Sequence, residues 1–240
     1  AAGVTFVSSK TVIYVILLKR KVSMSVSFQE WVKNCQHQLE LFLETHRGKF
    51  ALGHLTYDLK NEIEPLHSRN TDHLAFPDLY FFIPEYLLKI NGPNIIIDAE
   101  NPDLVWKAID EVILPTVFKT GFSGNLMARL SYENYREAII RIKQHILRGD
   151  IYEINYCQEF FAKQATIHPI NTFIALNELS PTPFANFFKH EQRYILSATP
   201  ERFLSKRANK LISQPIKGTA KRNTDAAEDL LLKTQLRNNL

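Results

Sequence analysis

Residues 184–219 read FANFFKHEQRYILSATPERFLSKRANKLISQPIKGT, and this stretch decides the fold class. Apolar and β-branched runs alternate here with short polar turns, which predicts strands in close order. The four predicted strands are Phe184–Lys189, Tyr194–Ala198, Phe203–Lys206 and Lys210–Gln214. Because strands follow one another without helices between them, the pattern favours an α+β protein over a doubly wound sheet.

The amino-terminal half of the chain adds further strands. Five more are predicted: two within Val4–Val22, one within Phe50–Asp58, and two at Leu79–Ile83 and Tyr86–Ile90. The dipeptide Asn91-Gly92 is a turn signal, which predicts a hairpin into a further strand at Asn94–Asp98. Gly53 lies inside a predicted strand and indicates a close approach of a neighbouring backbone.

Helical spacing is clearest after Ser131, a good N-cap residue. The predicted helix ends at Gly149, a residue suited to the left-handed stop position. A strand is predicted next at Ile151–Ala162, because apolar and polar residues alternate there; Glu153 and Asn155 share its polar face. Other helices are predicted at Phe28–His46, 101–112, Ile170–Leu179 and, capped by Thr224, Asp225–Arg237. Without a linker or repeat, residues 1–240 are expected to form a single domain.

Composition excludes several classes of function. The net charge is +4 and the basic residues are scattered, so no nucleic-acid partner is expected. Cys35 and Cys157 are far apart and match no metal spacing, which indicates a reduced, cytoplasmic protein. The longest apolar run, Val12–Leu18, is too short to cross a bilayer, so no membrane partner is expected. There is no HExxH, P-loop or GxGxxG motif, and hence no sign of a nucleotide cofactor.

The segment Pro215–Thr219 is the strongest candidate for chemistry. Gly218 would let a ligand approach the backbone, and Thr219 offers a hydroxyl and an amide to a carboxylate. Lys217 stands between them and the preceding strand. A desolvated lysine amine is a nucleophile or a base, whereas the alternative interpretation is an exposed loop lysine.

Two further carboxylates are candidates. Glu201 lies in a tight turn between two strands, where it is either a general acid or a turn residue paired with Arg202. Glu153 and Asn155 point either into a cleft or into water, since one face of an antiparallel sheet is commonly wet.

The order of these segments resembles the chorismate-utilising enzymes: anthranilate, aminodeoxychorismate, isochorismate and salicylate synthases. The likeness covers roughly residues 50–235. Five motifs carry it: Phe50–Glu64, Tyr135–Cys157, Ser180–Phe184, Leu196–Phe203 and Pro215–Thr219. The family implies a two-sheet antiparallel β-sandwich with flanking helices.

Position 217 separates the branches of this family. Lysine here is similar to the aminodeoxychorismate synthases, whereas anthranilate synthases usually carry alanine. The resemblance implies that Lys217 attacks chorismate and that Glu201 assists departure of the hydroxyl. It also implies that Gly218 and Thr219 contact the substrate. Glu153 and Asn155 would be further binding residues. It also implies Mg²⁺, a partner glutamine amidotransferase subunit, and a product for p-aminobenzoate and folate biosynthesis. The alternatives are anthranilate synthase component I and a non-catalytic module with this fold.

Several departures from the family pattern matter. Glu153 replaces a common glutamine and argues against the isochorismate branch, which has lysine there. Ser180 and Phe184 replace asparagine and tyrosine in a loop that lines a tryptophan pocket in anthranilate synthases, so tryptophan inhibition is left open. The chain is also expected to be a fragment, truncated at both ends, that lacks the start and the carboxyl-terminal third of the family. The carboxylates that bind magnesium are expected in that third, and the fragment alone is expected to be inactive.

Overall fold

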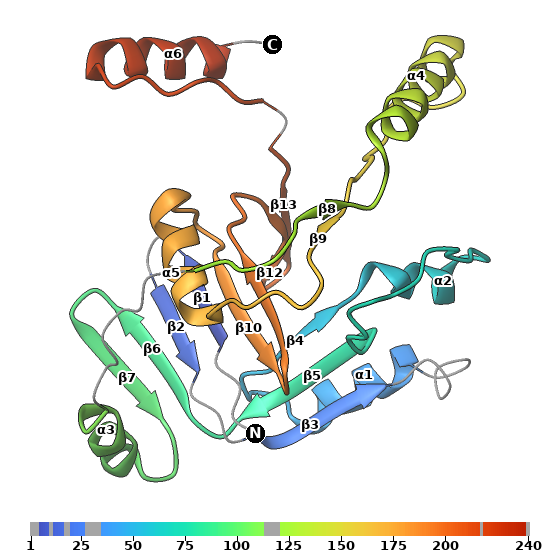
Figure 1. Cartoon of the computed structure of the whole chain (residues 1–240). Helices are drawn as coiled ribbons and strands as arrows, with labels where there is room; N and C mark the ends of the chain where they lie inside the picture. Colours follow the sequence, from blue (N-terminus) through green and yellow to red (C-terminus); the bar gives the residue numbers. More distant parts are fainter. Residues whose placement is uncertain are drawn as a thin grey trace. The chain divides into compact units, whose positions relative to one another are not determined.

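The computed structural model describes residues 5–9, 12–16, 20–26, 35–112, 121–216 and 218–238, coloured along the chain in Figure 1. The chain divides into two compact units. The larger unit combines residues 1–113 with residues 176–240, and the smaller unit comprises residues 114–175. The larger unit therefore joins the two ends of the sequence.

A six-stranded antiparallel sheet forms much of the larger unit (Figure 1). Its order is β11-β10-β1-β2-β6-β7. The strands are β1 (Thr5–Ser9), β2 (Val12–Ile16), β6 (Leu87–Asn91), β7 (Asn94–Asp98), β10 (Asn186–His190) and β11 (Arg193–Ser197). The predicted hairpin β6–β7 is confirmed, and Gly92 has the positive φ of 57° that its turn requires. Strands β10 and β11, each predicted as a strand, also pair with one another.

The central contact of this sheet joins distant parts of the sequence. Strand β1 pairs with β10, with Phe6 opposite Phe187 and Val7 opposite Asn186. Phe187 is only 1% exposed, and its ring lies 6.0 Å from that of Tyr194 on β11. The amino-terminal hairpin is therefore fixed by residues from the far end of the chain.

A second sheet has three antiparallel strands in the order β3-β5-β4. These are β3 (Arg20–Val26), β4 (Leu52–Leu55) and β5 (Leu79–Pro84). Strand β3 was not predicted, although Val22, Met24 and Val26 alternate with serine after the basic cluster. Gly53 pairs with Phe81, and a Cβ atom at Gly53 would lie 2.8 Å from the Phe81 Cα atom, so the predicted close approach is confirmed.

The core of the larger unit combines side chains from both sheets. One buried cluster contains Tyr80 and Phe82 of β5, Leu87 of β6 and Phe188 of β10. A neighbouring cluster forms around Leu79, which is 1% exposed. Strand β5 contributes most because it is the central strand of its sheet and its apolar run is nearly continuous.

Three helices of the larger unit follow the predictions with shifted ends: α1 (Cys35–Thr45), α3 (Pro102–Asp110) and α6 (Ala226–Asn238). The 3-10 helix η1 (Tyr57–Leu59) and the short helix α2 (Lys60–Ile63) were not predicted. The predicted start of the first helix, residues 28–34, lies outside the described residues. The predicted cap Thr224 is wrong for α6, because the Asp225 carboxylate accepts from the Ala227 and Glu228 backbone amides at 3.0 and 2.9 Å.

The smaller unit is built around α4 (Tyr132–Arg148). Ser131 caps this helix by accepting from the Asn134 amide at 3.2 Å, and Gly149 ends it with φ 80°, both as predicted. The predicted strand at 151–162 is wrong except for β9 (Phe160–Phe161), which pairs with β8 (Met127–Ala128). Helix α5 (Pro169–Leu179) begins in this unit.

The α+β class predicted from the sequence is confirmed. All strand pairs of the described residues are antiparallel, as expected for an α+β protein and not for a doubly wound parallel sheet. None of the helices in the described ranges combines the length and apolar character needed to span a bilayer.

Candidate active site

A two-stranded hairpin carries the main candidate residues. Its strands are β12 (Arg202–Arg207) and β13 (Lys210–Gln214), and Arg202 pairs with Gln214. Glu201 immediately precedes β12, and the segment 215–219 immediately follows β13. Because the strands are antiparallel, their register brings both motifs to the same open end of the hairpin.

The turn before β12 is stabilised locally. The Glu201 amide donates to the Thr199 hydroxyl at 3.3 Å, and that hydroxyl lies 3.4 Å from the Glu201 carbonyl oxygen. A Thr side chain that bonds to the backbone two residues on is typical of such turns. Glu201 itself is exposed, so its carboxylate is accessible at the end of the hairpin.

Lys217 lies outside the described residues. Its neighbours Gly218 and Thr219 are both exposed. A Cβ atom at Gly218 would lie 3.2 Å from the Leu236 Cδ1 atom of α6, so the chain passes close to this helix directly after position 217. Glycine at 218 therefore avoids a tight contact with α6, whatever its role toward a ligand.

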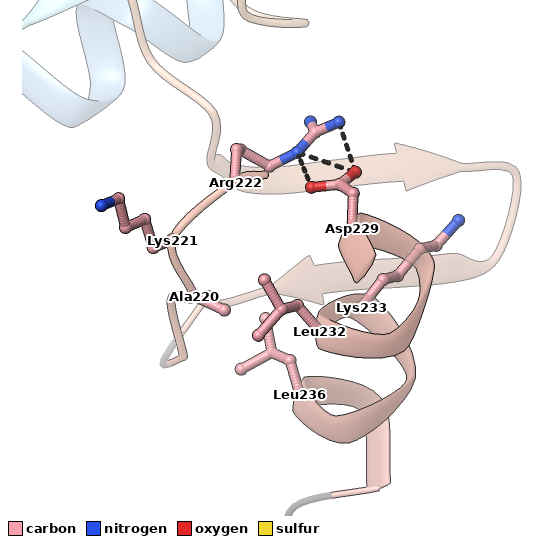
Figure 2. Close-up of a pocket in the computed structure, with 7 residues that line it drawn as sticks. All are labelled: Ala220, Lys221, Arg222, Asp229, Leu232, Lys233 and Leu236. Carbon is pink, nitrogen blue, oxygen red and sulfur yellow. Dashed lines mark hydrogen bonds and ion pairs between the residues drawn. The ribbon is translucent and has the colours of Figure 1, made fainter. Parts of the chain in front are cut away.

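An ion pair, drawn in Figure 2, joins the segment that follows Thr219 to α6. Arg222 donates from Nε to Asp229 Oδ1 at 2.8 Å and from a terminal nitrogen to Oδ2 at 2.8 Å. The Asn223 amide also donates to Asp229 Oδ1, at 3.0 Å. The hydrogen bonds from Arg222, and to a smaller extent the one from the Asn223 amide, lower the pKa of the Asp229 carboxyl. The bonds between Arg222 and Asp229 also raise the pKa of Arg222.

A shallow hollow lies between this segment and α6 (Figure 2). Its volume is about 310 Å³. It is lined by Ala220, Lys221, Arg222, Asp229, Leu232, Lys233 and Leu236. The pair Arg222 and Asp229 was not predicted from the sequence. The local pattern shows only that Asp229 is an acidic residue in the first turn of a helix, and this does not identify the residue that pairs with it.

Glu153 and Asn155 belong to the smaller unit, so the hairpin does not carry them. Both are exposed and lie in the irregular segment between α4 and β9, which corrects their predicted place on one face of a strand. Alternation alone did not form a strand here, because a strand also needs a neighbour to satisfy its backbone. Nearby, Tyr156 contacts Tyr135 of α4, with ring centroids 5.4 Å apart.

The start of that segment is organised by charges at the end of α4. Asp150 accepts from Arg148 at 2.7 Å and lies 2.8 Å from the His145 Nδ1 atom. Hydrogen bonds from Arg148, and next from His145, lower the pKa of the Asp150 carboxyl. The basic side chains also suit the negative end of the helix.

Among the residues that the structure describes, no group of three or more His, Cys, Asp or Glu side chains is arranged to hold a metal ion.

Comparison with protein families decides the family. The model of the chorismate binding enzymes matches residues 10–240. This chain belongs to that family. The match includes the hairpin, the segment 215–219 and α6.

Curated relatives fall into two groups. The chain is 25% identical over 233 residues to aminodeoxychorismate synthase component 1 of Bacillus subtilis, covering 89% of this chain and 48% of the relative. It is 29% identical over 198 residues to anthranilate synthase component 1 of Thermus thermophilus, covering 78% of this chain and 43% of the relative. The chain thus spans about half the length of these relatives, and overall identity does not separate the two reactions.

The fold is that of a solved family structure. Anthranilate synthase component I from Streptococcus pneumoniae superposes with a TM-score of 0.68 at 17% identity. The match covers 98% of this chain and 55% of that structure. The fold class inferred from the strand pattern is therefore that of this enzyme.

Proposed function

We propose that this chain is the chorismate-binding part of an aminodeoxychorismate synthase component I. The enzyme would replace the C4 hydroxyl of chorismate with an amino group and keep the pyruvyl side chain. Lysine at position 217 carries this proposal, because it distinguishes the sequence from the anthranilate branch that resembles it equally well.

The proposed mechanism uses Lys217 as nucleophile and Glu201 as acid. The neutral Lys217 amine forms a C–N bond to the chorismate ring, the C4–O bond breaks, and Glu201 supplies the proton with which the hydroxyl leaves as water. Ammonia then forms its own C–N bond as the bond between Lys217 and the ring breaks, and the surplus proton of the new ammonium group returns to the Glu201 carboxylate. The hairpin supports this division of roles, since Glu201 and the segment 215–219 lie at one end of it.

Substrate binding is proposed for four further residues. The Thr219 hydroxyl and amide would hold a chorismate carboxylate, and Gly218 would leave room for it beside the backbone. Glu153 and Asn155 are proposed to complete the substrate site, as the resemblance implies. Mg²⁺ is proposed as the cofactor on the same ground, and no catalytic step is assigned to it.

The wider assignment follows from the same proposal. Ammonia would come from a glutamine amidotransferase subunit, and the product would enter p-aminobenzoate and folate biosynthesis in the cytoplasm. We also propose that the two compact units belong to one chorismate-binding domain. The six-stranded and three-stranded sheets would form the two layers of its β-sandwich; the shared cluster of Tyr80, Phe82, Leu87 and Phe188 supports this.

Anthranilate synthase component I is the second candidate, favoured by the 29% identity to the Thermus thermophilus enzyme. That reaction would release pyruvate and an aromatic amine. Alanine at position 217 would be expected for it, and this chain has lysine.

Product analysis distinguishes the candidates. The protein expressed from its complete reading frame is incubated with chorismate, Mg²⁺ and ammonium, and the products are identified by chromatography and mass. We expect a product that keeps the pyruvyl carbons and gains an amine, formed by the parent and not by Lys217→Ala. Lys210→Ala, an exposed lysine at the other end of β13, is the matched control and should keep the activity.

Each other outcome has a defined meaning. Anthranilate with pyruvate would assign the second candidate. Chorismate binding without any turnover would assign a non-catalytic module.

A further inference from the structure

Arg202 occupies an unusual position beside the proposed acid. It follows Glu201 in the sequence, and its backbone pairs with Gln214 at the end of β13. Its guanidinium carbon lies 5.0 Å from the centre of the Phe184 ring, within the range of a cation–π contact. Its Nε atom is buried and has no hydrogen-bond partner among the described residues. Arg202 therefore faces Phe184 and does not form the turn pairing with Glu201 that the sequence left open.

Phe184 is joined to the same turn through its backbone. Its amide donates to the Thr199 carbonyl oxygen at 3.2 Å. The Thr199 hydroxyl in turn accepts from the Glu201 amide at 3.3 Å. The contacts close a ring: from Phe184 to Thr199, on to Glu201 and Arg202, and back to Phe184.

This closed ring restricts the Glu201 turn from two sides. A single threonine hydroxyl on an exposed turn holds it weakly, because water competes for the same donors. The Arg202 side chain adds a second attachment, to a half-buried ring whose neighbour Ala185 is 1% exposed. The turn is thereby connected to the start of β10, a strand of the six-stranded sheet.

We propose that Arg202 is a positioning residue that holds Glu201 through its contact with the face of Phe184. This inference rests on the proposed function, in which Glu201 delivers a proton to the leaving hydroxyl. Proton transfer of this kind requires a donor within hydrogen-bond reach of the leaving oxygen. Loss of the contact should therefore lower kcat and leave chorismate binding largely intact.

The test uses four variants of the protein from its complete reading frame. Arg202→Met keeps an unbranched apolar stem and removes the guanidinium group with its charge. Phe184→Leu removes the aromatic face, and Phe184→Tyr keeps it. The fourth variant combines Arg202→Met with Phe184→Leu.

We expect kcat to fall about 10- to 100-fold in Arg202→Met and in Phe184→Leu, with KM for chorismate within about twofold of the parent, since small displacements of a catalytic group cost up to about 100-fold. Phe184→Tyr should keep the parent kcat. Because both residues act through one contact, the double variant should lose no more than the single variants do. Thermal unfolding of each variant separates loss of folding from loss of positioning.

Amide hydrogen exchange gives a second readout that does not depend on turnover. The Glu201 amide should exchange faster in Arg202→Met and Phe184→Leu than in the parent and in Phe184→Tyr. Parent-like kcat and exchange in Arg202→Met would overturn the positioning role and leave the proposed function standing. A parent protein without amination activity would overturn the proposed function, and with it the catalytic role given to Arg202.

Discussion

Gly53→Ala tests the tightest backbone contact of the fold. Gly53 of β4 lies opposite Phe81 of β5. An added Cβ atom would collide with the Tyr80 carbonyl oxygen and would lie 2.8 Å from both the Cα and Cγ atoms of Phe81. Two of these three atoms belong to the backbone and cannot rotate away, so β4 must separate from β5 around this position.

The expected cost can be built from two contributions. Forcing an extra methyl group into a packed site costs about 1–3 kcal/mol. Separating the strands locally loses about two backbone hydrogen bonds at about 1 kcal/mol each. The free energy of unfolding should therefore fall by about 3–5 kcal/mol in total, which for 240 residues lowers the unfolding temperature by about 6–10 °C.

Gly48→Ala is the matched control, because its cost has a different origin. Gly48 has φ 82°, and no atom lies within 4 Å of its added Cβ position. Placing an L-residue in this left-handed conformation costs about 1 kcal/mol, or about 2 °C. Thermal and urea unfolding of the full chain measure both variants. If Gly53→Ala destabilised the chain no more than Gly48→Ala, the close contact between β4 and β5 would be refuted.

Three other perturbations have defined outcomes. Burial lowers the pKa of His54, so as pH falls below about 6.5 the unfolded chain binds a proton before the folded chain does. The free energy of unfolding, measured with urea, should therefore fall as pH falls below this value, and it should fall less steeply with pH in His54→Gln. An equally steep fall in His54→Gln would contradict this. Asp229→Asn removes the negative charge and one of the two oxygens that accept from Arg222, so trypsin should cleave after Arg222 faster than in the parent. Equal rates would show that the ion pair does not restrain the segment. Leu79 is 1% exposed, so Leu79→Ala should lower the free energy of unfolding by about 2–5 kcal/mol. Phe203 is 92% exposed, so Phe203→Ala should change it by no more than about 0.5 kcal/mol. Similar changes in both variants would refute the assigned core.

Local chemistry explains which elements could be predicted. Helix α4 begins at Ser131 and ends at Gly149 because a hydroxyl cap and a left-handed glycine act within a few residues of themselves. The hairpins β6–β7 and β10–β11 have connections so short that few alternative pairings exist. The Gly53 contact was likewise visible, since glycine inside an apolar strand has few other reasons to be there.

Predictions failed where the outcome depended on distant partners. Residues 151–159 alternate like a strand, yet the described structure pairs only Phe160–Phe161, with Met127–Ala128. The Thr224 cap was displaced by Asp225, whose carboxylate reaches two amides of α6. The periodicity of a segment shows which of its side chains share a face. Whether another strand pairs with the segment depends on residues elsewhere in the chain.

The sequence by itself determined the α+β class, the family and the order of the motifs around Glu201 and position 217, because these depend on residue types at fixed spacings. The tertiary structure alone decided that β1 pairs with β10 and that Arg202 turns to Phe184. Such contacts depend on the register of strands and helices far apart in the sequence. That register is selected by burial of the whole core, which no local pattern records.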